Sequence, residues 1–195
     1  MESKDITQYV DFEVTKKKFG NEINEFRALE DSYNERGVFL IEIKGFILQL
    51  LFSATHIKPS PILFSVELDY SNWDFEPPSL KLINPFTKAV LRSNEVGIQF
   101  LQWNEEAQDA QPLLVGHDIP FLCIPGIREY HRHLHHSGDS WMLYRTRGEG
   151  KLTDVIEKII KHSVIPLAGY LVNVNGHSVV FSQFPLVSNK TKAPR

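Results

Sequence analysis

The sequence predicts an α+β domain in which an N-terminal helix precedes an antiparallel four-strand meander, a His-rich loop and a C-terminal helix. Three patterns indicate this order: an amphipathic spacing near the N-terminus, four short apolar runs separated by turn residues, and a second amphipathic segment just after residue 150. A further pair of apolar runs beyond that segment predicts a hairpin added at the C-terminal end.

The length of the chain fits one domain. Its 195 residues are 42% hydrophobic and include 13 Phe, 6 Tyr and 3 Trp, which is enough large apolar surface for a core. We therefore expect a single domain over residues 1–195, with its core at about 14–162 and a hairpin extension at about 168–184. The tail at 188–195 is expected to be disordered.

Charge and cysteine content exclude several classes of protein. The 21 basic and 24 acidic residues leave a net charge of −3, which gives no electrostatic reason for a nucleic-acid or membrane partner. The single cysteine excludes an intrachain disulfide, and hence a secreted scaffold held by disulfides. The first residues carry acids where a signal peptide needs an apolar run, and the apolar stretch at 45–54 is too short to cross a bilayer. We expect a soluble, cytoplasmic protein that binds neither nucleic acid nor membrane.

The N-terminal half contains the expected helix and sheet. Residues 13–36 favour one helix that ends at Gly37, because large apolar side chains recur there at spacings of three and four. Four apolar runs then favour strands, with Gly45 as the turn residue between the first two and a Pro-Pro pair before the fourth. The runs lie at residues 38–43, 46–52, 62–68 and 80–83.

The C-terminal half is less regular. From 87 to 120 the periodicity weakens, and the acids Glu105, Glu106 and Asp109 suggest a solvated loop or a short helix. Residues 151–162 predict the second helix, because their aliphatic side chains fall on one helical face. The dipeptide Asn175-Gly176, between two apolar runs, gives the best hairpin prediction in the chain.

One segment carries residue types that do chemistry. Cys123, the sole cysteine, precedes Glu129 and a cluster of four histidines. Thiolate, carboxylate and imidazole are the ligands that zinc and similar divalent ions prefer, and Pro and Gly residues in the segment favour a loop that can fold around an ion. The four histidines are His131, His133, His135 and His136.

Two other interpretations of this segment stay open. Cys123 can be an ordinary buried thiol beside a polar loop that holds no metal, because buried free thiols are common in proteins. Alternatively, Cys123 is a nucleophile whose pKa is lowered by a nearby histidine. The residue types alone do not distinguish a thiolate that binds zinc from one that attacks a carbonyl.

The order of elements resembles the ubiquitin-conjugating enzyme fold. The stretch from Asn72 to Leu82, NWDFEPPSLKL, is similar to the aromatic-Pro-aromatic-x-Pro-Pro sequence that leaves the third strand in that family, with Asp74 at the first proline. The family's catalytic cysteine falls on Cys123, and its following tryptophan falls on Trp141. This resemblance implies transfer of a ubiquitin-like protein through a thioester on Cys123.

The segment from Leu122 to Trp141 closely resembles a bacterial family described as a predicted metal-binding domain of the Cys-Glu-His-His type. Members of that family lie in operons with ubiquitin-like proteins, an activating-enzyme homologue and a metalloprotease of the deubiquitinase kind. The resemblance implies that the Cys, Glu, His and His for which the family is named are Cys123, Glu129, His131 and one of His133 or His136. Spacing alone does not exclude His135.

Together the two resemblances lead to three expectations. In the first, Cys123 carries the ubiquitin-like protein, and Glu129 or a nearby histidine such as His131 deprotonates the attacking nucleophile. In the second, zinc is held by Cys123, Glu129, His131 and His136, in a domain that is either non-catalytic or hydrolytic. In the third, the fold serves only as a binding scaffold. The expected partners are a ubiquitin-like protein and an activating-enzyme homologue.

Overall fold

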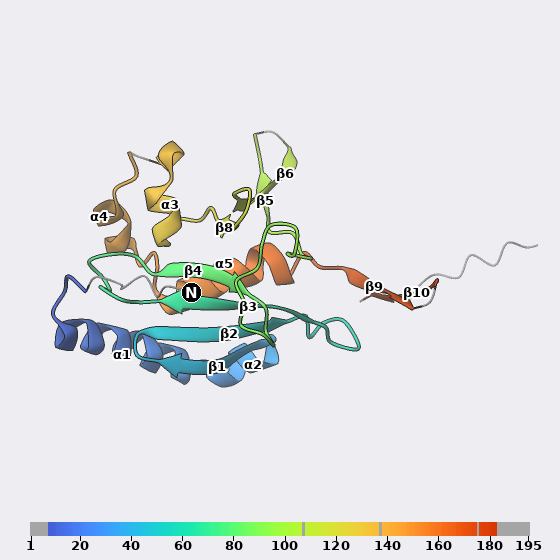
Figure 1. Ribbon diagram of the computed structural model, residues 1–195, viewed down its shortest axis with the longest axis horizontal. Helices are drawn as coiled ribbons and strands as arrows, with labels where there is room; N and C mark the ends of the chain where they lie inside the picture. The colour runs from blue at the N-terminus through green and yellow to red at the C-terminus, as the bar shows by residue number, and fades with distance from the viewer. Residues whose placement is uncertain (1–7, 107, 137, 175, 183–195) are drawn as a thin grey trace, which may run out of the picture.

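The protein has the α+β architecture that its sequence predicts. A computed structural model describes residues 8–106, 108–136, 138–174 and 176–182. In it, a four-stranded antiparallel sheet packs against N-terminal helices, and the C-terminal hairpin extends away from the body of the molecule (Figure 1). The predicted tail at 188–195 lies outside the described residues. None of the described helices is long and apolar enough to cross a membrane.

The N-terminal helical region is interrupted at one residue. Helix α1 (Phe12–Ala28) begins at Asp11, whose carboxylate accepts hydrogen bonds from the first turn, and it buries Phe19 and Phe26. Helix α2 (Glu30–Glu35) follows directly. The prediction of one continuous helix over 13–36 is therefore wrong at Leu29. This residue is 47% exposed, so burial does not hold it in line with the apolar face.

The four-strand meander lies where the apolar runs predict it. Its strands pair in the order β1-β2-β3-β4, each antiparallel to the next. Alternate residues such as Leu48, Leu50 and Phe52 are fully buried, while the residues between them are more exposed, which is the period-two pattern of a half-buried sheet. The strands are β1 (Val38–Lys44), β2 (Ile47–Ser53), β3 (Ile62–Asp69) and β4 (Ser79–Ile83).

The expectation of a solvated loop or a short helix at Glu105, Glu106 and Asp109 holds in part: the two glutamates lie in a turn, but Asp109 begins a strand. The first pair, β5 (Leu101–Asn104) and β6 (Asp109–Pro112), makes a hairpin with Glu105 and Glu106 at its turn. All four residues of β6 are exposed, so the apolar alternation that marks a strand in sequence is missing there. The shorter strands β7 (Leu114–Val115) and β8 (Phe121–Leu122) follow and lead directly to Cys123.

Short helical elements carry the chain from Cys123 to the C-terminal helix. Helix α5 buries Leu152, Val155, Ile156 and Ile159, which confirms the predicted apolar face. It continues into a single π-helical turn. The predicted C-terminal hairpin is confirmed over β9 and β10, whereas Asn175 of its turn lies outside the described residues. The elements are α3 (Arg128–Arg132), η1 (Leu134–His136), α4 (Trp141–Tyr144), η2 (Arg145–Arg147), α5 (Leu152–Ile159), η3 (Ile160–Val164), β9 (Gly169–Val174) and β10 (His177–Ser182).

Candidate active site

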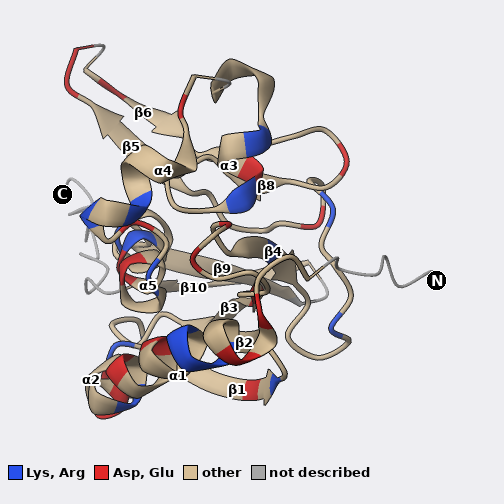
Figure 2. Ribbon diagram, turned by 90° about the vertical axis from the view of Figure 1, so that its left-hand side faces the viewer, with Lys and Arg blue, Asp and Glu red and all other residues tan. Residues whose placement is uncertain are grey.

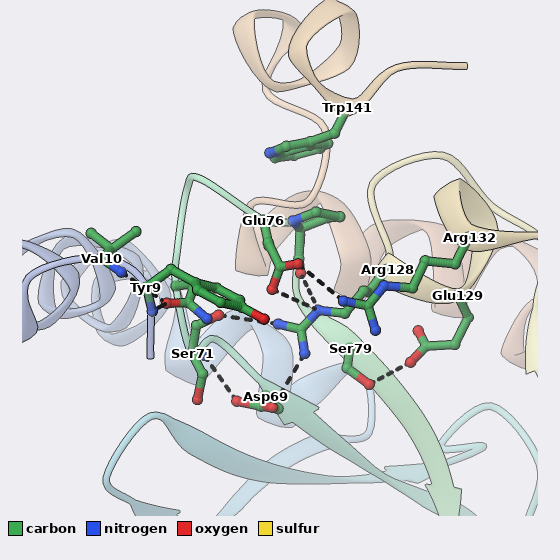
Figure 3. A network of polar contacts seen from close by, with 12 residues as sticks. Tyr9, Val10, Asp69, Ser71, Glu76, Ser79, Arg128, Glu129, Arg132 and Trp141 are labelled. Atoms are coloured by element: carbon green, nitrogen blue, oxygen red, sulfur yellow. Dashed lines mark hydrogen bonds and ion pairs between the residues drawn. The ribbon is translucent and has the colours of Figure 1, made fainter. Parts of the chain in front are cut away.

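Helix α3 is anchored to the sheet by a buried arginine. Arg128 donates hydrogen bonds to the carbonyl oxygens of Pro77 and Ser71, at 3.2 and 3.1 Å (Figure 3). Its guanidinium also lies 3.5 Å from a carboxylate oxygen of Asp69 and 3.7 Å from one of Glu76. A buried cation needs such partners, because removing it from water is costly. Arg128 therefore fixes the start of α3 and, with it, the chain on either side.

Glu129 also faces the sheet. Its carboxylate accepts hydrogen bonds from the Ser79 hydroxyl and, at 3.1 Å, from the backbone N–H of Leu80 at the start of β4 (Figure 3). No hydrogen bond within the described part of the chain joins Glu129 to Cys123 or to a histidine of the cluster. The structure therefore places Glu129 as a second attachment of α3 to the sheet.

Cys123 and His136 form a close pair. Cys123 follows β8, where its backbone N–H donates to the carbonyl of Leu113 at 2.7 Å. Its Sγ lies 3.2 Å from Nε2 of His136, which is on the short η1 turn. Burial raises the pKa of the Cys123 thiol above its ordinary value. The thiol is therefore protonated at neutral pH and needs a base in order to react, and the His136 nitrogen is in position to be that base.

Asp139 orients the imidazole of His136. Nδ1 of His136 lies 3.3 Å from Oδ2 of Asp139, and the same oxygen accepts a 2.7 Å hydrogen bond from the Tyr130 hydroxyl. This bond from Tyr130, together with His136, lowers the pKa of Asp139. The Tyr130 ring also stacks on the His136 ring, with centroids 3.9 Å apart. Cys123, His136 and Asp139 thus form a thiol–imidazole–carboxylate chain of contacts, the kind of arrangement that activates cysteine and serine nucleophiles on unrelated folds.

The remaining histidines have separate environments. Nδ1 of His131 lies 2.7 Å from the carbonyl oxygen of Asp139, and its Nε2 accepts from the backbone N–H of Gly126 at 3.5 Å. His131 thus ties α3 to the loops on both sides and has neither nitrogen free. His133 packs its ring on Phe121, and its buried Nδ1 has no hydrogen-bond partner within the described residues. His135 is exposed beside His133.

The predicted zinc set does not fit a closed four-ligand site in this arrangement. Tetrahedral zinc in a structural site needs four donors directed at one point. Cys123 and His136 approach each other, but Glu129 is bound to β4, and both nitrogens of His131 are engaged. No group of three or more His, Cys, Asp or Glu side chains arranged to hold an ion occurs within the residues that the structure describes.

The loop after Cys123 is packed tightly against the start of the C-terminal helix. Gly126 has a φ of +100°, and a Cβ there would lie 2.5 Å from the backbone nitrogen of Gly150. Only glycine allows this approach. Lys158 of α5 donates to the carbonyl of Pro125 at 3.1 Å. Trp141 is buried with its ring beside Gly150, and its indole N–H donates to the carbonyl of Asp74 at 2.9 Å.

Sequence reasoning singled out Cys123 and His136 but missed how they are completed. Asp139 and Tyr130 lie within the segment from Leu122 to Trp141, and their residue types alone predict no role for either. Asp139 follows His136 by three residues, a spacing that brings side chains together in a turn. That spacing is the one feature of the sequence that points to their contact.

Comparison with known proteins finds matches over most of the chain. Residues 10–116 and 111–167 match the Y4jH family, described as Y4jH-like. A protein of Sinorhizobium fredii (strain NBRC 101917 / NGR234), named uncharacterized protein y4jH, is 35% identical over 177 residues, which cover 82% of this chain and 86% of the relative. The second matched region includes every residue from Cys123 to Asp139.

Proposed function

The chain belongs to the Y4jH-like family, and we propose that it is a conjugating-enzyme-like carrier that holds a ubiquitin-like protein as a thioester on Cys123. The observation that carries this proposal is the alignment of Cys123, His136 and Asp139, with 3.2 Å between thiol and imidazole and 3.3 Å between imidazole and carboxylate. A thiol whose pKa is raised by burial gains most from such a base.

Loading of the carrier is a thioester exchange. Nε2 of His136 takes the proton of the Cys123 thiol as Sγ bonds to the carbonyl carbon of the incoming thioester, supplied by an activating enzyme. The tetrahedral intermediate then collapses, and the bond between the carbonyl carbon and the sulfur of the activating enzyme breaks. The thiolate of the activating enzyme takes the proton from His136. Asp139 favours the imidazolium in between, because its carboxylate faces Nδ1.

Discharge uses the same groups in reverse. An acceptor nucleophile gives its proton to His136 and attacks the thioester carbonyl, and Cys123 leaves as a thiolate that is then reprotonated. In this scheme Glu129 and His131 are positioning residues. Glu129 holds α3 to β4, and His131 holds α3 to the loops that carry Cys123 and Asp139.

The order of the elements supports the same proposal. The cysteine follows an N-terminal helix and a four-strand meander, and a buried tryptophan and a C-terminal helix come after it. This is the order that resembles ubiquitin-conjugating enzymes. Fold alone does not assign an activity, so the proposal depends on the site.

A zinc-binding domain is the second candidate. The observation that favours it is the buried Nδ1 of His133, which has no hydrogen-bond partner among the described residues and lies on a ring 6.0 Å from that of His136. The full set of Cys123, Glu129, His131 and His136 would require Glu129 and His131 to leave their present partners.

One sample tests both candidates. Tag-free protein is mixed with a peptide thioester of mercaptoethanesulfonate, and the covalent adduct is followed by intact mass. Zinc is measured by elemental analysis, and thiol titration is done before and after chelation. The carrier proposal predicts a hydroxylamine-sensitive adduct that Cys123→Ala abolishes. Stoichiometric zinc, with a thiol that only a chelator unmasks, would overturn it in favour of the zinc domain. If the protein forms no adduct and holds no zinc, both candidates are overturned and a binding scaffold remains.

A further inference from the structure

The two faces of the β5–β6 hairpin differ in chemistry. Side chains alternate between the faces along each strand, and directly opposed residues of the two strands share a face. One face carries Gln102 and Gln111, which line the same cleft as Cys123. The opposite face, called the apolar face below, carries no polar side chain. Its side chains are those of Leu101, Trp103, Ala110 and Pro112.

The apolar face is open within the part of the chain that the structure describes. Trp103 is 59% exposed, and Ala110 and Pro112 are exposed as well. At the base of this face lies a hollow of about 340 Å³, whose lining residues are apolar apart from Gln99. A hollow of that size is at the small end of binding pockets and suits one large side chain. A two-stranded hairpin is marginally stable by itself, so its apolar face gains from a further element that packs on it.

The base of the hairpin is held firmly. The side chains of Phe100 and Leu113 are buried in the core, and the backbone N–H of Leu113 donates to the carbonyl of Phe100 at 2.8 Å. Nδ1 of His162 donates to the carbonyl of Leu101 at 2.8 Å, which ties β5 to η3. The hollow therefore exists before a partner arrives, and binding there does not have to order the hairpin first.

The charge around the apolar face is acidic. No Lys or Arg occurs between Ser93 and Asp118, whereas Glu105, Glu106 and Asp109 are exposed at the outer end of the hairpin (Figure 2). Carboxylates of one sign attract a cationic partner and repel an acidic one. A second copy of this chain, with its net charge of −3, is therefore a poorer match than a basic segment.

We propose that the apolar face of the β5–β6 hairpin docks a basic segment of a partner protein. One large apolar side chain of that segment enters the hollow beside Leu101, and its Lys or Arg side chains lie beside Glu105 and Glu106. From Leu101 to Glu105 an extended chain advances about 13 Å, so the basic side chains follow the apolar one by about four residues. This inference goes beyond the proposed carrier function and does not require Cys123 to react.

Peptide selection tests the apolar face. Random twelve-residue peptides displayed on phage are selected on the full chain carrying Cys123→Ala, so that no thiol chemistry contributes. Enriched peptides should combine a large apolar residue with Lys or Arg about four positions away. A fluorescent copy of the most enriched peptide is then titrated by anisotropy. Trp103→Ser and, separately, Glu105→Gln with Glu106→Gln should each weaken its binding about three- to tenfold.

Matched changes elsewhere on the surface are the controls. Phe86→Ser removes an aromatic side chain that is 79% exposed, and Asp31→Asn with Glu35→Gln removes two exposed charges from α2, far from the hairpin (Figure 2). Both should leave the affinity for the peptide unchanged.

Three results would overturn the assigned partner. The first is a selection that enriches no peptide or only peptides without Lys and Arg. The second is an affinity that neither hairpin variant lowers. The third is a dimer of the peptide-free protein, seen by sedimentation, that Trp103→Ser dissociates, because a second copy would then cover the face. None of these results bears on whether Cys123 forms a thioester, so the carrier proposal stands or falls separately.

Discussion

Helix α3 separates two polar clusters that differ in how firmly they are held. On the sheet side, Arg128 and Asp69 are only 11% and 10% exposed, and Arg128 contacts four groups. On the loop side, His136 and Asp139 are 24% and 36% exposed, with contacts of 3.2 and 3.3 Å along the line from Cys123. Arg128, His136 and Asp139 come from one short stretch of sequence, whereas Asp69 comes from β3.

Under the proposed function, this difference divides the charged residues near Cys123 between those that hold the fold and those that take part in the chemistry. A buried ion that loses its partner costs stability, because the remaining charge has no water to solvate it. A half-exposed pair can lose a member at little cost to the fold, because water replaces the lost contact. The two clusters should therefore respond to substitution in different assays.

The largest effect is expected at His136. Replacing it by Gln removes the base beside Cys123 and should slow thioester exchange by about 10²-fold or more, the usual contribution of a positioned base. The melting temperature should change little. Rates come from the mass assay at pH 7, with Asp139→Asn as a weaker second variant. A rate within twofold of wild type would remove His136 from the mechanism.

The next largest effect is expected on stability, at Arg128. Arg128→Met leaves the buried carboxylate of Asp69 without its cation and should lower the free energy of unfolding by about 3–5 kcal/mol. Urea denaturation measures it. The matched control is Arg132→Met on the same helix, whose side chain is 65% exposed and also pairs with Glu76. This control should cost under about 1 kcal/mol. Equal losses would mean that burial does not separate the two arginines.

A substitution at Glu129 tests whether this residue serves the stability of the fold or the proposed chemistry. Glu129→Gln weakens the bonds to Ser79 and Leu80 and should lower the free energy of unfolding by about 1–3 kcal/mol. The rate of adduct formation per folded molecule should stay within about twofold of wild type, since the proposed mechanism assigns the proton transfer to His136. A lower rate of adduct formation without a loss of stability would mean that Glu129 takes part in the reaction and does not stabilise the fold.

The smallest effect is expected at a surface pair remote from both clusters. The hydrogen bond from Arg36, with the charge of that residue, holds the pKa of Glu157 below its usual value. A lowered folded pKa contributes stability that is present above the unfolded pKa and is lost as pH falls through the folded one. Glu157→Gln should thus cost at most about 1 kcal/mol at pH 7 and nothing near pH 2, by urea denaturation at both values. An equal loss of stability at the two pH values would show that the ion pair with Arg36 is not the source of that loss.

Much of the fold could be predicted because the spacing of apolar residues along the sequence reflects which side of a helix or strand is buried. The four strands of the meander and the apolar face of α5 bury one side each, so their sequences carry that period. Strand β6 is exposed throughout and carries none. The break at Leu29 was missed because the spacing of apolar residues continues across it.

The site could be predicted only as a set of residue types. Successive helical residues point about 100° apart, so Glu129 and His131 on one short helix face nearly opposite directions. Glu129 thus reaches the sheet while His131 reaches the loops. Nothing in the spacing of Cys123, Glu129 and the histidines says which of them turn toward the thiol, because the direction depends on where α3 docks.

The contact between Gly126 and Gly150 has a consequence for exchanging parts between relatives. The loop after Cys123 and the segment before α5 touch through the backbones of these two glycines, which have no side chains that could adapt to a change. A graft of residues 123–141 alone would separate this loop from the glycine that it was shaped against. A chimera should therefore have its second junction beyond Gly150, so that Gly126 and Gly150 come from the same parent protein.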